Sequence, residues 1–421
     1  MRYVSTLGGV PSVSFSEAIA VGPAPEGGLF VPESVPRAAS LATDSLAVIA
    51  ARAIRPFLEG DALERAVHQL CQDAYAFPAP VVPAGPDTEV LELFHGPTLA
   101  FKDFGARFLA ACLSQRRGGA RTVLVATSGD TGGAVAAAFH RRPAIRVVLL
   151  FPLGRISERQ RKQLSSFGDN VSAIGVRGTF DDCQRIVKQA FADRALEAEH
   201  GLTSANSISV GRWLPQVAYF ASASIEHCAK FGEPAGIVVP SGNLGNGAAA
   251  CLAKRMGFPI REVVLAFNEN QAVPEYFQTG EYRPRPAVAT PANAMDVGDP
   301  SNFERLRWLY PKRHELLREV SAVSIKTPKI LATIRDTYRR LGLVVCPHTA
   351  VGLAARESRS GSFIVAATAH PVKFEEIVEP LVGRRIDVPE ALEALLCRPA
   401  THSEMNPTLD ELRERLALRP S

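Results

Sequence analysis

The sequence predicts an α/β fold in which parallel sheets are covered by helices on both faces. From about residue 88, short runs rich in Val, Ile and Leu alternate with longer segments of helical periodicity. The short runs are apolar throughout, which is typical of parallel strands that are buried on both faces. With 421 residues, the chain is also too long for one small core and should form two or three packed units. Ligands of such sheets bind at the carboxyl ends of the strands.

The first of these units is an N-terminal, mainly helical subdomain that spans residues 1–90. Helical periodicity covers 45–57 and 62–76, and a segment rich in Pro, FPAPVVPAGP at 77–86, follows as a connection.

The remaining chain carries the strands and helices of the predicted sheets. The strands are expected at 121–126, 145–151, 171–176, 236–240, 262–267 and 362–367. The helices are expected at 134–140, 156–167, 180–199, 211–230 and 248–256. We expect a smaller, mobile α/β domain over 91–220 and a larger α/β domain over 221–421.

Composition and charge argue against several classes of function. The net charge of +4 is too small to indicate a surface that binds nucleic acid. No apolar run approaches the roughly 20 residues of a membrane helix, and the N-terminus shows no secretory signal, so we expect a cytoplasmic protein. The seven cysteines include no Cys-x-x-Cys pair, so neither a metal site nor a disulfide framework is expected. Whether the chain is a monomer or a homodimer stays open.

Two glycine-rich loops follow predicted strands and precede helices made of small residues. Their sequences are SGDTGG at 128–133 and SGNLGNG at 241–247. Glycines allow close approach of the backbone to a ligand, and the free N–H groups of a helix start favour an anion. The second loop offers more backbone donors and is the better phosphate cradle. It lacks the Lys of a Walker P-loop, and neither loop fits Gly-x-Gly-x-x-Gly, which argues against a dehydrogenase. A single loop of this kind is more often only a turn.

Two further segments each contain one residue whose side chain suits a functional site. Lys102 lies among Leu99, Phe101 and Phe104, and a desolvated lysine amine can form a Schiff base with an aldehyde. The alternative is a lysine whose stem packs on apolar surface while its amine reaches solvent. Thr368 follows a predicted strand, where its hydroxyl can face a ligand or cap the next helix.

Together, these segments resemble the threonine synthase family of pyridoxal-phosphate enzymes, which have fold type II, the fold of the tryptophan synthase β-like group. The resemblance covers nearly the whole chain. The matching motifs are GGLFVP at 27–32, HGPTLAFKDFG at 95–105, ATSGDTGGAVA at 126–136, ANSISVGR at 205–212, PSGNLGNG at 240–247, NAMDVGDPSNFERL at 293–306, PHTAVG at 347–352 and TAHPVKF at 368–374.

The resemblance implies a role for each residue of the expected site. It assigns Lys102 to the Schiff base with pyridoxal phosphate, Thr368 to the pyridine nitrogen and Asp130 to the neighbourhood of the 3′ oxygen. The positions that match the cofactor's phosphate cradle are Gly242, Asn243, Leu244 and Asn246. The candidates for binding the substrate's phosphate are Ser128, Thr131, Asn206 and Arg212. Structural and functional roles stay equally open for His95 and His348.

The implied reaction converts O-phospho-L-homoserine and water to L-threonine and phosphate. The chain departs from the family pattern at Leu7, where an Arg is usual, and at Ser209, where an Asn is usual. These departures keep open a related lyase or replacement enzyme that acts on another phosphorylated amino acid. A catalytically silent binding protein built on the same fold is a further alternative, against which the presence of Lys102 argues.

Overall fold

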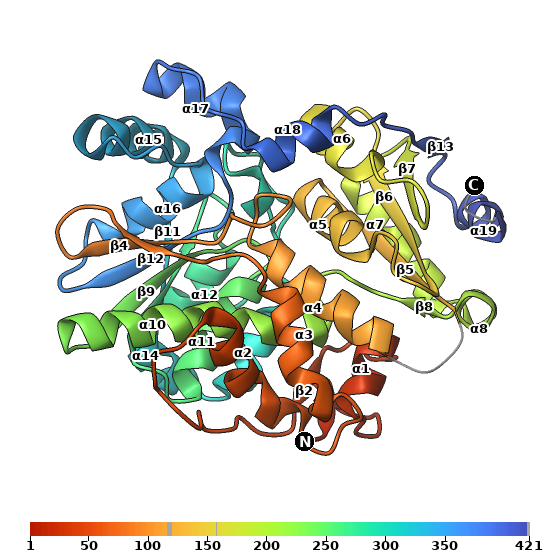
Figure 1. Cartoon of the computed structure of the whole chain (residues 1–421), viewed down its shortest axis with the longest axis horizontal. Helices are drawn as coiled ribbons and strands as arrows, with labels where there is room; N and C mark the ends of the chain where they lie inside the picture. Colours follow the sequence, from red (N-terminus) through yellow and green to blue (C-terminus); the bar gives the residue numbers. More distant parts are fainter. Residues whose placement is uncertain (116–119, 157, 419–421) are drawn as a thin grey trace.

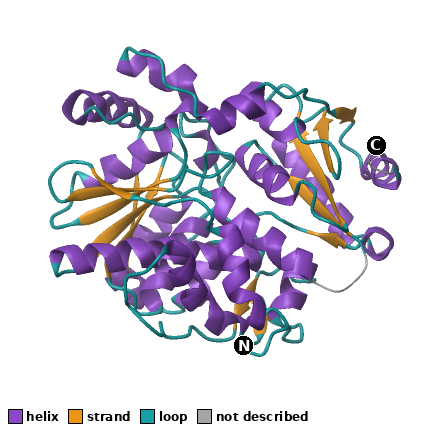
Figure 2. Cartoon of the chain, in the orientation of Figure 1, coloured by secondary structure: helices purple, strands orange, loops and turns teal. Residues whose placement is uncertain are grey.

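The computed structural model describes residues 1–115, 120–156 and 158–418. Its two main sheets lie on opposite sides of the molecule, with helices packed between and around them (Figure 1). A small antiparallel pair, β1 (Tyr3–Ser5) and β2 (Phe30–Pro32), lies near the N-terminus. Figure 2 shows the strands gathered in these separate groups while helices fill most of the remaining volume.

The larger sheet has six strands in the order β11-β10-β9-β12-β4-β3. All neighbouring strands are parallel except β3, which pairs antiparallel with β4 at the edge. The strands are β3 (Val81–Pro83), β4 (Thr88–Glu92), β9 (Ala235–Pro240), β10 (Ile260–Phe267), β11 (Val320–Ser324) and β12 (Phe363–Ala367).

The smaller sheet has five strands in the order β13-β7-β6-β5-β8, and all of its neighbours are parallel. The strands are β5 (Arg121–Ala126), β6 (Ile145–Pro152), β7 (Val171–Val176), β8 (Leu202–Thr203) and β13 (Ser403–Met405). Both sheets combine strands from different expected units. Strands β3 and β4, which start within 1–90, join strands of 221–421, and β13 of 221–421 joins β7 of 91–220.

Helices cover both faces of each sheet. The α-helices are α1 (Phe15–Val21), α2 (Leu46–Ile54), α3 (Val67–Ala74), α4 (Lys102–Gln115), α5 (Asp130–Phe139), α6 (Glu158–Ser165), α7 (Phe180–Ala192), α8 (Arg194–His200), α9 (Val210–Trp213), α10 (Val217–Phe231), α11 (Gly245–Arg255), α12 (Ala272–Thr279), α13 (Phe303–Leu309), α14 (Arg313–Glu319), α15 (Thr327–Leu341), α16 (Pro347–Arg356), α17 (Glu375–Val382), α18 (Glu390–Leu396) and α19 (Leu409–Ala417). The short 3-10 helices are η1 (Arg55–Leu58), η2 (Glu64–Ala66), η3 (Leu214–Gln216), η4 (Asn293–Met295) and η5 (Pro371–Phe374).

Alternation along the strands fills three apolar cores. In β9, Ile237 and Val239 face the core between the two sheets, while Val238 faces the opposite core under α16. In β5, Val123 joins the shared core and Leu124 joins a third core under α7. Successive side chains of a strand point to opposite faces, so a strand buried on both sides must be apolar at every position. Each fully buried aliphatic side chain contributes about 1.5–3 kcal/mol to this packing.

All six strands expected from the sequence are present, with ends that shift by at most a few residues. The helices differ more, and each difference has a local cause. The segment 180–199 divides at Asp193, whose carboxylate accepts hydrogen bonds from the amides of Ala195 and Leu196 and starts α8. The segment 211–230 divides around Pro215, which lacks an amide hydrogen. Helix α6 matches 156–167, of which residue 157 lies outside the described residues.

Within the described ranges, none of the helices combines the length and the apolar character that crossing a membrane requires.

Candidate active site

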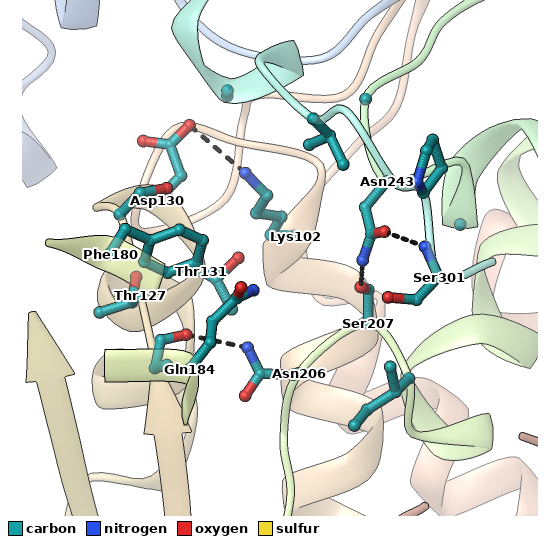
Figure 3. A pocket seen from close by; sticks show the side chains of 18 of the residues that line it. Lys102, Thr127, Asp130, Thr131, Phe180, Gln184, Asn206, Ser207, Asn243 and Ser301 are labelled. Carbon is teal, nitrogen blue, oxygen red and sulfur yellow. Dashed lines mark hydrogen bonds and ion pairs between the residues drawn. The ribbon is translucent and has the colours of Figure 1, made fainter. Parts of the chain in front are cut away.

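The loops after β5, β9 and β12 line one cavity of about 1760 Å³. It opens at the carboxyl ends of these parallel strands, where ligands of α/β folds bind. All the residues that the sequence analysis assigns to the site line it: Lys102, Ser128, Asp130, Thr131, Asn206, Arg212, Gly242, Asn243, Leu244, Asn246 and Thr368. Figure 3 shows Lys102 between Asp130 on one wall and Asn243 on the other.

Lys102 is the first residue of α4, and the loop before it is anchored beside Thr368. The amide of Phe101 donates to the Thr368 carbonyl at 2.9 Å, and the amide of His370 donates to the Leu99 carbonyl at 3.1 Å. Asp103 accepts hydrogen bonds from the amide and the hydroxyl of Thr98, which fixes the turn that leads into the helix. The lysine therefore projects from a rigid helix start next to the end of β12.

Burial changes the proton affinity of Lys102, whose side chain is 17% exposed. Desolvation lowers the pKa of the amine, the carboxylate of Asp130 raises it, and the charges of Lys373 and Arg212 lower it again. The net effect is a pKa below the usual range of lysine. A larger fraction of neutral amine is what a lysine nucleophile or base requires.

Asp130 lies between two lysines. Its carboxylate is 3.7 Å from Lys102 Nζ and 2.8 Å from Lys373 Nζ. Burial alone would raise the pKa of Asp130, but the two ammonium groups and the hydrogen bond from Lys373 hold it well below its usual range. Lys373 lies within the motif TAHPVKF but is not among the expected site residues, because its distance from Asp130 in the sequence gives no sign of this contact.

The loop between β9 and α11 forms an anion cradle. Leu244 adopts a left-handed conformation with φ of +63°, and α11 begins at Gly245 without an acidic residue in its first turn. The amide of Ala248 donates to the Leu244 carbonyl, so the amides before it precede the regular helical ladder. A Cβ on Gly242 would lie 2.7 Å from Met295 Cα, which leaves this position to glycine. These amides and the helix dipole favour a phosphate.

Two asparagines of this loop are held by side chains that the sequence analysis does not name. Asn243 donates to Ser207 Oγ and accepts from the amide of Ser301, both at 2.6 Å (Figure 3). Asn246 pairs through Oδ1 with the hydroxyl of Tyr219 at 2.7 Å, while its buried Nδ2 has no partner in the described part of the chain. A buried amide donor without an acceptor indicates that a ligand completes the site.

Arg212 is a buried cation that lines the same cavity. The residue is 3% exposed, its Nη1 donates to the Ala205 carbonyl, and its Nε has no hydrogen-bond partner among the described residues. Burial lowers its pKa to about 10, so it stays charged at neutral pH. Asn206 donates to the Ala126 carbonyl at 2.9 Å, and its side chain lines the cavity (Figure 3).

The remaining residues that the sequence analysis discusses divide into two groups. His348 lines the cavity, where burial lowers its pKa to about 4, and its Nε2 accepts from the amide of Ala294. His95 is exposed and pairs with Glu92 on the surface. Leu7 is also exposed and Ser209 is fully buried, and neither is among the residues that line the cavity.

Three family models match the chain. A model for pyridoxal-phosphate dependent enzymes covers residues 90–364, one for the threonine synthase N terminus covers 2–75, and one for the C-terminal part of threonine synthase covers 349–415.

Individual proteins match over nearly their full length. Threonine synthase from Serratia marcescens is 38% identical, with 97% of each chain covered, and that from Escherichia coli K12 is 38% identical, with 90% and 91% covered. The crystal structure of threonine synthase from Escherichia coli superposes with a TM-score of 0.91 at 36% identity over 99% of each chain. The pyridoxal-phosphate-bound threonine synthase from Brucella melitensis superposes with a TM-score of 0.92 at 34% identity, covering 99% of this chain and 98% of that one. The chain therefore belongs to the threonine synthase family of pyridoxal-phosphate-dependent enzymes.

Proposed function

We propose that the cavity converts O-phospho-L-homoserine and water to L-threonine and phosphate. The observation that carries the proposal is the presence of three groups in one cavity: the partly desolvated amine of Lys102, the amide cradle at 242–246 and the buried cation of Arg212. The cradle accounts for one phosphate and Arg212 for a second. A phosphorylated cofactor and a phosphorylated substrate together need both.

The cavity fits pyridoxal phosphate as its cofactor. The unpartnered Nδ2 of Asn246 and the close approach of Gly242 to Met295 leave a cradle whose donors suit a phosphate. We assign Lys102 to the aldehyde carbon, Thr368 to the ring nitrogen and Asp130 to the 3′ oxygen, beside the phosphate contacts of Gly242, Asn243, Leu244 and Asn246. When bound, this cofactor supplies an electron sink that stabilises negative charge next to the amino group of the substrate.

Within this arrangement, Lys102 moves the protons of the reaction. Its lowered pKa makes the neutral amine available as a base at Cα and Cβ of the substrate. The hydroxyl of Thr368 provides a neutral partner for the ring nitrogen. It cannot stabilise a full positive charge there as a carboxylate would, so the sink stays mild and protons can be redirected among Cα, Cβ and Cγ.

A second group of residues in the cavity binds the phosphate that leaves the substrate. We assign Arg212, Ser128, Thr131 and Asn206 to this group, since all four line the cavity. A dianionic leaving group is stabilised by charge-assisted hydrogen bonds, which the charged guanidinium of Arg212 can provide.

We further propose that the five-stranded sheet closes toward the six-stranded sheet when substrate binds. The loop with Ser128 and Thr131 follows β5, whereas the cradle follows β9, so closure would bring the two phosphate sites together and exclude water. We place the enzyme in the cytoplasm, as a monomer or homodimer that requires neither nucleic acid nor a membrane. The seven unpaired cysteines fit a reducing compartment.

The test is an assay of the purified chain with pyridoxal phosphate and O-phospho-L-homoserine that follows both phosphate and threonine. We expect the two products to form in equal amounts and to disappear in Lys102→Ala. The matched control is Lys329→Ala, which removes a surface lysine paired with Glu357. Phosphate without threonine would contradict the proposal, and turnover of a different phosphorylated amino acid in a substrate panel would favour the alternative lyase or replacement enzyme.

A further inference from the structure

A second lysine, Lys373, is buried behind the reactive one. Its side chain is 1% exposed, and its Nζ contacts Asp130 Oδ1 and the Thr98 carbonyl, both at 2.8 Å. A lysine this deeply buried is rare unless it is paired. Lys373 comes from η5 after β12, Thr98 from the loop before α4, and Asp130 from the start of α5 after β5. One ammonium group therefore joins three segments that surround Lys102.

The backbone around Lys373 is fixed from both sides. The amide of Lys373 donates to the His370 carbonyl, and Arg159 of α6 donates to the Val372 carbonyl at 2.8 Å. Asp130 is equally constrained, because its side chain is 4% exposed and it occupies the first position of α5. The contact between Lys373 and Asp130 is thus an ordered, buried ion pair rather than a surface pair that salt would screen.

Counting charges shows why one carboxylate is accompanied by two lysines. Lys102 must give up its ammonium proton before its amine can act as a nucleophile or a base. If Lys102 were the only partner of Asp130, each such step would leave a carboxylate buried without a counterion, at a cost of several kcal/mol. Lys373 does not react and remains beside Asp130 throughout.

We propose that Lys373 is a positioning residue that keeps Asp130 as an oriented carboxylate, so that the amine of Lys102 can lose and regain its proton without stranding a buried charge. The inference rests on the proposed role of Lys102 as the reactive amine. Lys373 acts through Asp130 and through its own field, and it does not itself contact the reacting atoms.

Among the described residues, the charged or titratable groups that act on Lys102 come from the elements packed against it: Asp130 of α5, Lys373 of η5, Arg212 of α9 and His348 of α16. Removing the charge of Lys373 removes its repulsion of the Lys102 ammonium, and Asp130 then pairs with Lys102 without a competing lysine. Lys102 should therefore hold its proton more tightly. Removing the charge of Asp130 should have the opposite effect. The two substitutions should therefore shift the titration of Lys102 in opposite directions.

The experiment measures the rate at which an amine-reactive reagent labels Lys102 in cofactor-free protein, as a function of pH, with the labelled peptide quantified by mass spectrometry. We expect Lys373→Met to move the midpoint to higher pH and to slow labelling at pH 8 about threefold or more, since each pH unit changes the neutral fraction about tenfold. Asp130→Asn should move the midpoint lower, and the double variant should lie between the two single variants. Lys373→Arg should restore most of the parent behaviour, and Lys329→Met is the surface control.

Equal midpoints in the parent chain, Lys373→Met and Asp130→Asn would overturn the proposal, as would shifts in the same direction. If Lys373→Met fails to fold, Asp130→Asn and Lys373→Arg still decide between the outcomes. Cofactor binding and turnover by the parent chain are measured separately. An absence of both defeats the proposed function, whereas normal turnover with unshifted midpoints defeats only the role of Lys373.

Discussion

The loops after β5 and after β9 share one local design but handle their backbone amides in opposite ways. In the loop after β5, the side chain of Thr127 accepts hydrogen bonds from the amides of Gly129 and Gly132, at 3.0 and 2.8 Å. The helix that follows starts with a buried carboxylate, Asp130. In the loop after β9, none of the described side chains accepts from the loop's own amides in this way, and its helix starts without an acid. The first loop provides an acceptor for two of its own amides and presents a charge, whereas the second leaves its donors for a ligand.

The difference shows that a glycine-rich turn between a strand and a helix does not by itself define an anion site. Whether such a turn can bind an anion depends on where the amides at the helix start find their acceptors. Thr127 occupies that role in one loop, and in the other loop the only hydroxyl near the strand end, Ser241 Oγ, donates to the Val239 carbonyl instead. The two loops can therefore be separated by experiments that treat them as a pair.

The largest effect is expected from adding a methyl group to the open cradle. In Gly242→Ala, the new Cβ would lie 2.7 Å from Met295 Cα and 2.9 Å from the Ala294 carbonyl, so the backbone must move. We expect a loss of about 3 kcal/mol in pyridoxal-phosphate binding, or about a hundredfold in affinity, measured by absorbance titration of the cofactor-free protein. Gly133→Ala in the other loop is the matched control, because its nearest contact is an ordinary 3.5 Å. Equal losses in both variants would break the comparison.

The second prediction uses acid, to which the buried His348 that lines the cavity should respond. The pKa of His348 is lowered to about 4, so between pH 6.5 and about 4 the unfolded chain binds a proton there that the folded chain does not. The contribution of neutral His348 to stability is therefore fully present above pH 6.5, and about 3 kcal/mol of it is lost as the pH falls to 4. His370, also lowered to about 4, adds to the same slope.

Denaturant unfolding at a series of pH values measures this slope. His348→Gln should flatten it while keeping an acceptor for the amide of Ala294, and the exposed His314→Gln should leave it as in the parent chain. A slope that is unchanged in His348→Gln would mean that the histidine is not held neutral.

Much of the fold follows from local patterns. The six strands expected from the sequence are strongly apolar, and β5 and β7 have the expected bounds. The edge strands β3, β11 and β13 escape notice because they are short or half-exposed, and their pairing depends on segments far away in the chain. Both glycine-rich helices begin earlier than expected, at Asp130 and Gly245, because glycine suggests a loop even where it occupies the first turn of a helix.

The site divides in the same way. Motif resemblance finds the residues that project into the cavity, since these carry the distinctive side chains. It assigns no role to Lys373 or Ser207, which lie within matching motifs, or to Tyr219, and all three contact other site residues across long stretches of sequence. Such contacts depend on tertiary packing and leave no spacing signal in one sequence.

The third prediction removes the internal acceptor of the loop after β5. Thr127→Val keeps the shape of the side chain but removes the acceptor of two amides, and Thr127 is 1% exposed, so water cannot replace it. We expect a loss of about 1.5 kcal/mol in the free energy of unfolding, measured in denaturant, with a small effect on cofactor affinity. Ser241→Ala is the paired variant in the open loop and should cost less, because Ser241 supports no amide. A larger loss from Ser241→Ala would reverse the comparison.

The smallest effect is expected from the side-chain contact that orients Asn246 in the loop after β9. Tyr219 is buried and pairs with Asn246 Oδ1 at 2.7 Å, and this orients the amide so that Nδ2 stays free for the phosphate. Tyr219→Phe should lower pyridoxal-phosphate affinity by about 1 kcal/mol, or a few-fold, since the contact with Asn246 is lost together with the longer one to Gln216 Oε1 at 3.1 Å. Tyr75→Phe removes another buried hydroxyl, which donates to the Pro215 carbonyl away from the cavity, and should affect stability alone. If the two variants bind the cofactor equally well, the orientation of Asn246 is set by the ligand, and the cradle depends on its backbone amides alone.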